Sequence, residues 1–240
     1  FRHDIGFPWT LRIMAFIMLA TYIPCLVLFK SRLPPANIPN WIDTSAFSEK
    51  PFLLFSLSMF FNFWGLYFAF FFLGTYARDV LHMEKPINLV MILNGVGIIG
   101  RVLPTIIADR WTGMLNLVIP LGLVATIISF CWSAVSSVSG LYAFAVVYGL
   151  IAAALQSLLP ATATTMTNDP TKTGTRVGMI LGFVSLANLT GPAICGAIIE
   201  KQGGSYLGAQ MFAATCILMG AITAAATRIS KTGMVLRVKA

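Results

Sequence analysis

One arginine lies deep inside an apolar stretch of the chain, where a charge is costly. Arg101 stands about two-thirds of the way along a predicted helix over 87–108, and no other charge lies as far inside a predicted span. A charge at that depth costs a few kcal/mol even on a lenient insertion scale, which predicts a functional role. A guanidinium can hold a carboxylate through two parallel hydrogen bonds and stays charged. The alternative is a structural cation, paired with a carboxylate elsewhere or with helix carbonyls.

Arg101 shares one helix face with further polar and small residues. Asn94, Gly97, Arg101 and Thr105 follow one another at steps of three, four and four residues. These steps keep all four side chains within one narrow stripe of a helix. Such a stripe suits a water-filled cavity or a close neighbouring helix better than lipid. We therefore predict Asn94 as a ligand contact beside Arg101.

Other predicted helices carry comparable stripes. Their members are Ser58, Asn62, Gly65 and Ala69 over 52–74, and Tyr142, Gly149, Ala153, Gln156 and Pro160 over 141–162. Asn62 and Gln156 are candidate ligand contacts, but small and amide side chains also join membrane helices to one another. Both interpretations stay open for these two residues. For the stripe made of Gly178, Gly182, Ser185 and Gly196, nearly all glycine, we predict helix packing.

The elements that position these residues follow from composition. Of the 240 residues, 58% are hydrophobic and 10% are charged, with a mean hydropathy of +0.84. Soluble domains carry about 25% charged residues. Runs without any charge are long enough to cross a bilayer as helices. The sequence predicts an all-α, polytopic membrane bundle of about seven helices, over 8–29, 52–74, 87–108, 114–135, 141–162, 177–199 and 207–226.

This composition excludes most enzyme classes, a cofactor-dependent enzyme among them, and a nucleic-acid partner for the net charge of +8. Cys25, Cys131, Cys195 and Cys216 all lie in apolar stretches without paired spacing, so neither a disulfide framework nor a zinc site is predicted. The histidines stand outside the apolar spans, and no metal site follows from them. The chain begins with Phe1, from which we expect a fragment of a longer protein.

Lysine and arginine placement predicts the orientation. With the amino end outside, ten of these residues fall on the cytoplasmic side and five on the outer side. Cytoplasmic loops hold the excess of positive charge, which places the carboxyl terminus in the cytoplasm. Residues 30–51 contain four prolines and several charges and read as a linker. The predicted organisation is a helix over 1–29, a linker over 30–51, a six-helix domain over 52–227 and a tail over 228–240.

Several strings resemble the major facilitator superfamily. Gly100-Arg101-Val102-Leu103-Pro104 and Ala108-Asp109-Arg110, with Gly113 following, are similar to the end of its eighth helix and the next loop. Further strings resemble fungal monocarboxylate-transporter-like proteins, namely Gly6-Phe7-Pro8-Trp9-Thr10-Leu11-Arg12-Ile13, Arg32-Leu33-Pro34-Pro35 with Ala46-Phe47, and Leu189-Thr190-Gly191-Pro192 with Gly196. The resemblance covers nearly the whole chain. It implies the sixth to twelfth helices of a twelve-helix transporter, hence its carboxyl-terminal half.

The resemblance also implies a function. It indicates a secondary transporter that moves a small organic solute, a monocarboxylate first, by alternating access between two bundles. Arg101 then binds the substrate's anionic group, and Asp109 with Arg110 forms a conformational gate at the cytoplasmic edge. Transport needs the missing amino-terminal half, and proton coupling is an option. A multi-pass protein of the plasma membrane is expected ahead of one of a vacuolar or other internal membrane.

Two departures from the family pattern stand out. Gly113 comes one residue later than the usual G-x-x-x-D-R-x-G form places its last glycine. Animal monocarboxylate transporters have an Asp four residues before the buried arginine, where this chain has Gly97. The alternative class is a seven-helix receptor. This chain lacks two features that such a receptor would need, an N-P-x-x-Y string in the last helix and a cysteine pair at the outer ends.

Overall fold

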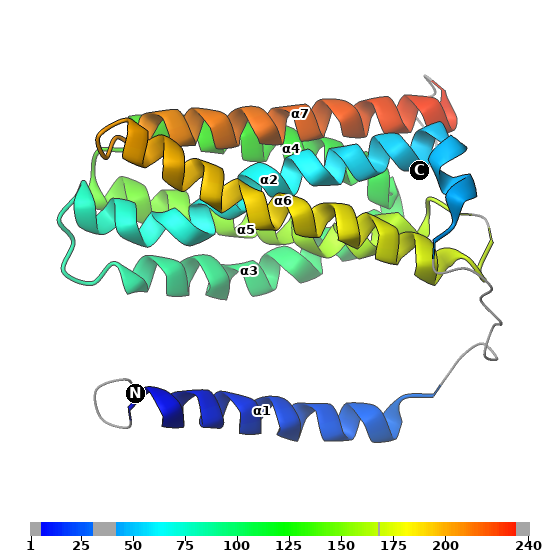
Figure 1. Ribbon diagram of the computed structural model, residues 1–240, viewed down its shortest axis with the longest axis horizontal. Helices are drawn as coiled ribbons and strands as arrows, with labels where there is room; N and C mark the ends of the chain where they lie inside the picture. The colour runs from blue at the N-terminus through cyan, green and yellow to red at the C-terminus, as the bar shows by residue number, and fades with distance from the viewer. Residues whose placement is uncertain (1–5, 31–41, 168, 234–240) are drawn as a thin grey trace. The chain divides into compact units, whose positions relative to one another are not determined.

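The computed structural model describes residues 6–30, 42–167 and 169–233. The chain divides into two units, residues 1–39 and residues 40–240. The first unit contains one helix, α1 (Phe7–Leu28), which has Pro8 in its first turn, where the missing N–H costs nothing. The second unit is a bundle of six long helices, which run side by side in Figure 1. The predicted linker residues 31–41 and tail residues 234–240 lie outside the described ranges.

Within the described ranges the fold is helical throughout, as predicted, and no strand occurs. The helices of the second unit are α2 (Lys50–Asp79), α3 (Ile87–Ile107), α4 (Met114–Cys131), α5 (Val138–Thr164), α6 (Thr173–Lys201) and α7 (Leu207–Thr232). Short turns η1 (Thr44–Ser48), η2 (Ala108–Thr112) and η3 (Trp132–Ala134) flank them. Seven of the described helices are long and apolar enough to cross a membrane. The chain is an all-α, multi-pass membrane protein.

Helix ends differ most from the prediction. The span predicted over 52–74 is the helix Lys50–Asp79, and that over 177–199 is Thr173–Lys201. Hydropathy falls where charged residues begin, but helical hydrogen bonding continues through them. The same continuation places Lys50 and Pro51, at the end of the predicted linker, in α2. Residues 44–48 form the turn η1, and α7 runs through Arg228 to Thr232.

Small residues set the packing of the bundle. A Cβ atom at Gly65 of α2 would collide with the backbone of Ala213 on α7. Between α3 and α5 the approach is closest at Gly100 and Gly149, where a Cβ would meet the carbonyl oxygens of Leu150 and Leu93. Close backbone approach through small residues stabilises helix pairs in lipid by van der Waals contact. The resulting α3–α5 contact positions Arg101 opposite Gln156.

The glycine stripe of α6 meets a neighbouring helix of the described residues only in part. Nothing lies within 4 Å of a Cβ built at Gly178 or Gly182, and Ser185 is exposed, whereas a Cβ at Gly196 would lie 3.6 Å from the Phe72 ring on α2. For Gly178 and Gly182 the packing role stays a prediction. Helix α6 instead packs on α2 at Gly191, where a Cβ would lie 2.5 Å from the Trp64 carbonyl oxygen. The sequence pattern identified a glycine face but not which face the neighbouring helix covers.

Candidate functional site

Arg101 and Gln156 form a direct contact between α3 and α5. The Arg101 Nη2 atom donates a hydrogen bond to Gln156 Oε1 over 3.2 Å. The Gln156 Nε2 atom is buried and has no hydrogen-bond partner in the described part of the chain. The Arg101 side chain is exposed along the surface of the bundle. Among the described residues the guanidinium therefore donates to one neutral acceptor, and the Gln156 Nε2 donor beside it is unused.

Hydroxyl groups extend this polar patch toward one end of α3. The Thr105 hydroxyl donates to the Arg101 carbonyl oxygen over 2.8 Å and lies 3.4 Å from the Ser157 hydroxyl. Asn94 is exposed on the same face of α3, and its Nδ2 atom donates to the Val90 carbonyl oxygen. We name Arg101, Gln156, Thr105 and Ser157 the anion patch. Asn94 lies along the patch but forms no side-chain contact with Arg101 in the described structure.

Asn62 lies elsewhere. Its side chain is 1% exposed, and its Nδ2 atom donates to the Ser58 carbonyl oxygen over 3.0 Å. The Ser58 hydroxyl in turn donates to the Gly220 carbonyl oxygen on α7 over 2.7 Å. A Cβ at Gly220 would collide with the Asn62 amide. Of the two interpretations left open by the sequence, these contacts favour helix packing for Asn62.

Asp109 and Arg110 lie in a widened turn at the end of α3. The Gly113 N–H donates to the Ala108 carbonyl oxygen five residues back over 2.8 Å, and both charged side chains are exposed. Such a π turn takes up one residue more than a normal helical turn. It ends at Gly113, whose φ of 86° is accessible to glycine at little cost. The extra residue accounts for the later position of this glycine in the family pattern.

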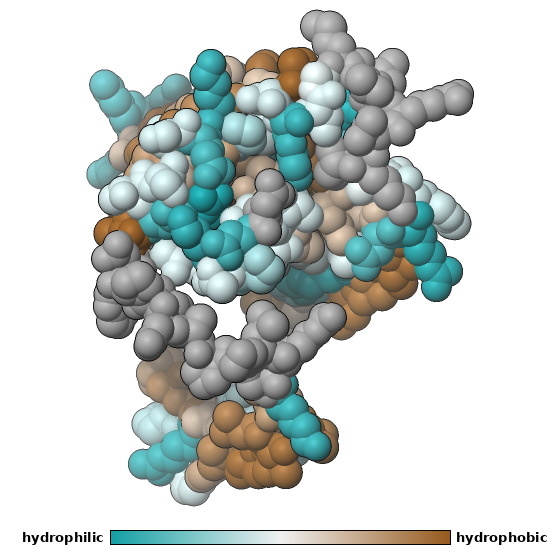
Figure 2. All heavy atoms as spheres, turned by 90° about the vertical axis from the view of Figure 1, so that its right-hand side faces the viewer, coloured by the Kyte–Doolittle hydropathy of each residue, from teal (hydrophilic) through white to brown (hydrophobic). Residues whose placement is uncertain are grey.

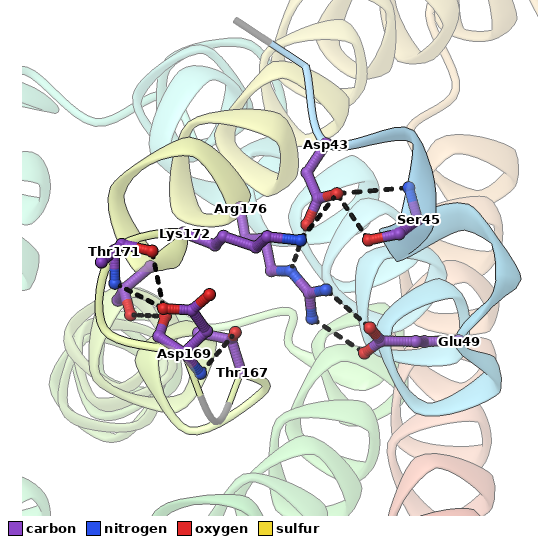
Figure 3. Close-up of polar contacts among 9 residues, drawn as sticks. Asp43, Ser45, Glu49, Thr167, Asp169, Thr171, Lys172 and Arg176 are labelled. Carbon is purple, nitrogen blue, oxygen red and sulfur yellow. Dashed lines mark hydrogen bonds and ion pairs between the residues drawn. The ribbon is translucent and has the colours of Figure 1, made fainter. Parts of the chain in front are cut away.

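A second arginine sits in a different environment, where α6 meets the start of α2 (Figure 3). The Arg176 side chain is 5% exposed. Its Nη1 and Nη2 atoms donate to the two carboxylate oxygens of Glu49 over 2.8 and 2.6 Å, and its Nε atom donates to Asp43 Oδ2 over 3.0 Å. Lys172 Nζ adds an ion pair with Asp43 Oδ1 at 3.6 Å. We name Asp43, Glu49, Lys172 and Arg176 the charge cluster.

Local capping positions the acids of the charge cluster. Asp43 is the N-cap of η1 and accepts from the backbone N–H and the hydroxyl of Ser45. The Ser45 hydrogen bond, together with the bond from Arg176 and the charges of Lys172 and Arg176, lowers the pKa of Asp43 to about 2. Glu49 precedes the first residue of α2. The segment predicted as linker thus ends in two carboxylates that fasten it to α6.

Sequence reasoning did not identify the charge cluster. Its carboxylates lie 133 and 127 residues from Arg176. Lys172 and Arg176 were assigned to topology, and the two acids were read only as part of the linker. The same end of the bundle carries further polar contacts, from Lys231 Nζ to the Thr165 carbonyl oxygen and from Arg228 to Asn116 Oδ1. Figure 2 looks onto this end, where hydrophilic side chains gather over the bundle. Among the described residues, no group of three or more His, Cys, Asp or Glu side chains could hold a metal ion.

Comparison with known proteins identifies the family. An MFS-type transporter of Gibberella zeae is 38% identical over 219 residues, which cover 90% of this chain and 49% of that protein. The chain belongs to the major facilitator superfamily. This result confirms the resemblance read from the Gly100–Pro104 and Ala108–Arg110 strings. No protein-family profile matches the chain.

Two further relatives have names that mention export. An aspyridones efflux protein of Emericella nidulans is 29% identical, over 92% of this chain and 45% of its own length. An agnestins efflux protein of Paecilomyces divaricatus is 30% identical, over 98% of this chain and 54% of its own length. The chain spans about half the length of the curated relatives it matches. These similarities to transporters do not favour the receptor alternative.

Proposed function

We propose that this chain is the carboxyl-terminal part of a secondary transporter that moves a small organic anion by alternating access. The observation that carries the proposal is Arg101, a charge within the span α3 that donates, among the described residues, to the neutral amide of Gln156. Intramembrane arginines are rare and mark ligand pathways or ion pairs. Membership of a family of transporters favours the first role. The whole protein is not an enzyme under this proposal.

The substrate in this proposal is an organic anion with a carboxylate, a monocarboxylate first. A guanidinium presents parallel donors that match the two oxygens of a carboxylate. Gln156 keeps Arg101 oriented through its Oε1 atom, and its free Nε2 atom can donate to the same ligand. Substrates of secondary transporters bind near the middle of the membrane between two bundles. The remaining part of the protein supplies the other wall of the site.

The experiment uses the full-length protein, purified in detergent, with equilibrium binding of a labelled monocarboxylate. Arg101→Lys keeps the charge but removes the fork of donors, so affinity should fall at least tenfold while folded yield is unchanged. Arg78→Lys is the control, because Arg78 is an exposed arginine paired with Asp79 at the end of α2. Normal binding by Arg101→Lys, or its failure to fold, contradicts the proposal.

Asp109 and Arg110 are proposed as a gate that biases the conformational equilibrium from the membrane edge. Asp109→Asn in the full-length protein should change transport rate more than substrate affinity.

We also propose an orientation for the protein in the plasma membrane. Asp109, Arg110 and the carboxyl terminus lie on its cytoplasmic side. A cysteine at Lys172 should resist an impermeant thiol reagent in intact cells, and one at Lys201 should react. The opposite labelling pattern excludes this orientation.

A further inference from the structure

The Arg101 side chain runs back along α3 toward the start of that helix. A Cβ atom built at Gly97 would lie 3.8 Å from the Arg101 Nη1 atom. Long side chains of an α-helix commonly lean over the preceding turn in this way. The guanidinium therefore lies beside Gly97, one turn before its own Cα atom. The next member of the same stripe in that direction is Asn94, which follows after an axial rise of about 4.5 Å.

The Asn94 amide is a second polar group on this face. It is exposed, and its Nδ2 atom donates to the Val90 carbonyl oxygen over 2.9 Å. A side-chain amide has two N–H donors and an acceptor oxygen, so most of its hydrogen-bonding capacity is not used by this bond. Since the amide reaches from Asn94 toward Val90, it lies about 4.5–10.5 Å along the axis from the Arg101 guanidinium. Between the two polar groups the same face presents the exposed side chain of Ile98.

We propose that the site selects carboxylates with a hydroxyl group at the far end of a short apolar chain. The carboxylate binds Arg101 and Gln156, and the distal hydroxyl binds the amide of Asn94. The apolar chain between these two ends lies over Ile98. The inference rests on the proposed function, because it takes Arg101 as the partner of the anion. One hydrogen bond between neutral groups corresponds to a preference of roughly two- to tenfold in affinity.

The test compares 6-hydroxyhexanoate with hexanoate at pH 7, where both are monoanions with the same carbon chain. The six single bonds from the carboxylate carbon to the hydroxyl oxygen span about 7 Å, as two residues of extended chain do. This length falls within the separation of the Arg101 guanidinium and the Asn94 amide. Equilibrium binding to the purified full-length protein should favour the hydroxy acid by about two- to tenfold.

Two variants locate the preference. Asn94→Leu keeps a similar shape but has no hydrogen-bonding atom, so the two acids should bind with nearly equal affinity. Asn88→Leu is the matched control, because Asn88 is also an exposed amide of α3. It stands six residues before Asn94, which places it about 120° around the helix. The preference for the hydroxy acid should be unchanged in this control.

The outcomes separate this inference from the proposed function. Equal affinity of the wild-type protein for both acids, with binding that still depends on Arg101, overturns the inference and leaves the proposed function standing. A preference for the hydroxy acid that survives in Asn94→Leu overturns the inference as well. Binding of both acids that is unchanged in Arg101→Lys overturns the proposed function itself. The wild-type ratio needs no variant, so a variant that fails to fold does not block the test.

Discussion

Arg101 and Arg176 lie in the same bundle but in contrasting surroundings. Arg176 is buried, and carboxylate oxygens of Glu49 and Asp43 accept hydrogen bonds from all three of its nitrogen atoms. Arg101 is exposed and donates to one neutral amide. An arginine whose donors are filled by its own chain stabilises the fold. An arginine with spare donors in an apolar span is suited to a ligand of opposite charge.

The largest expected effect is on stability at the charge cluster. Arg176→Met leaves Glu49 without its basic partner and Asp43 with Lys172 alone, which should lower the free energy of unfolding by about 3 kcal/mol. Chemical unfolding of the full-length protein in detergent measures this loss. Lys50→Met at an exposed position of the same region is the control and should change stability by less than about 0.5 kcal/mol. If Arg176→Met kept full stability but lost ligand binding, the structural role assigned to Arg176 would be wrong, and Arg176 would take the ligand-binding role assigned to Arg101.

The next largest effect is expected from a substitution that gives Arg101 a carboxylate partner, as Arg176 has. Gln156→Glu supplies a carboxylate to the guanidinium, so an anionic substrate loses its partner and meets a like charge. Affinity at pH 7 should fall by about 10- to 100-fold. Gln156→Leu, which removes only a neutral hydrogen bond, should cost about two- to tenfold. Binding by the Gln156→Glu protein that equals wild type would show that Arg101 is not the anion partner.

A smaller effect concerns the pH dependence of the charge cluster. The pKa of Asp43 is lowered from 3.8 to about 2 by Ser45, Lys172 and Arg176. A carboxyl whose pKa is lower in the folded state contributes stability above its unfolded pKa and loses it as the pH falls toward the folded pKa. The melting temperature should therefore not change between pH 5 and 8 through Asp43. It should fall between about pH 4 and pH 2, and Asp43→Asn should reduce that fall. An identical acid profile in the variant would exclude this contribution.

The smallest effect distinguishes a packing role for Asn62 from the binding role proposed for Gln156. Asn62→Ala removes a hydrogen bond within α2, from the Asn62 Nδ2 atom to the Ser58 carbonyl oxygen, and should lower the free energy of unfolding by about 0.5 kcal/mol. Substrate affinity should stay within about twofold of wild type, because Asn62 packs against Gly220 and not beside Arg101. Paired unfolding and binding measurements on the full-length protein check both parts. A tenfold loss of affinity would return Asn62 to the binding site.

The helices could be predicted from the sequence, but which helix packs against which could not. Uncharged runs such as 111–168 need internally hydrogen-bonded backbone in lipid, so helices were predictable. The stripes containing Asn62 and Gln156 each combine an amide side chain with small residues at helical spacing, yet one faces α7 and the other faces α3. Periodicity shows that residues share a face. Which helix covers that face depends on the tertiary packing.

The charge cluster escaped prediction for a related reason. Asp43, Glu49 and Arg176 stand at the ends of spans, where charges are common because water and lipid headgroups solvate them. Pairing across more than 120 residues leaves no local pattern. The observable signal was two acids just before one span and two bases at the start of another. Arg101 was identified only because apolar residues surround it in the sequence.

Because Asp43 binds Arg176, the covalent connection from α1 meets the bundle at Asp43 and not at the start of α2. From Phe29, after α1, to Asp43, the chain can span roughly 50 Å at full extension, since each residue adds at most about 3.5 Å. Because Asp43 and Glu49 both accept hydrogen bonds from Arg176, a displacement of residues 43–49 would act on the first turn of α6 as well as on the start of α2.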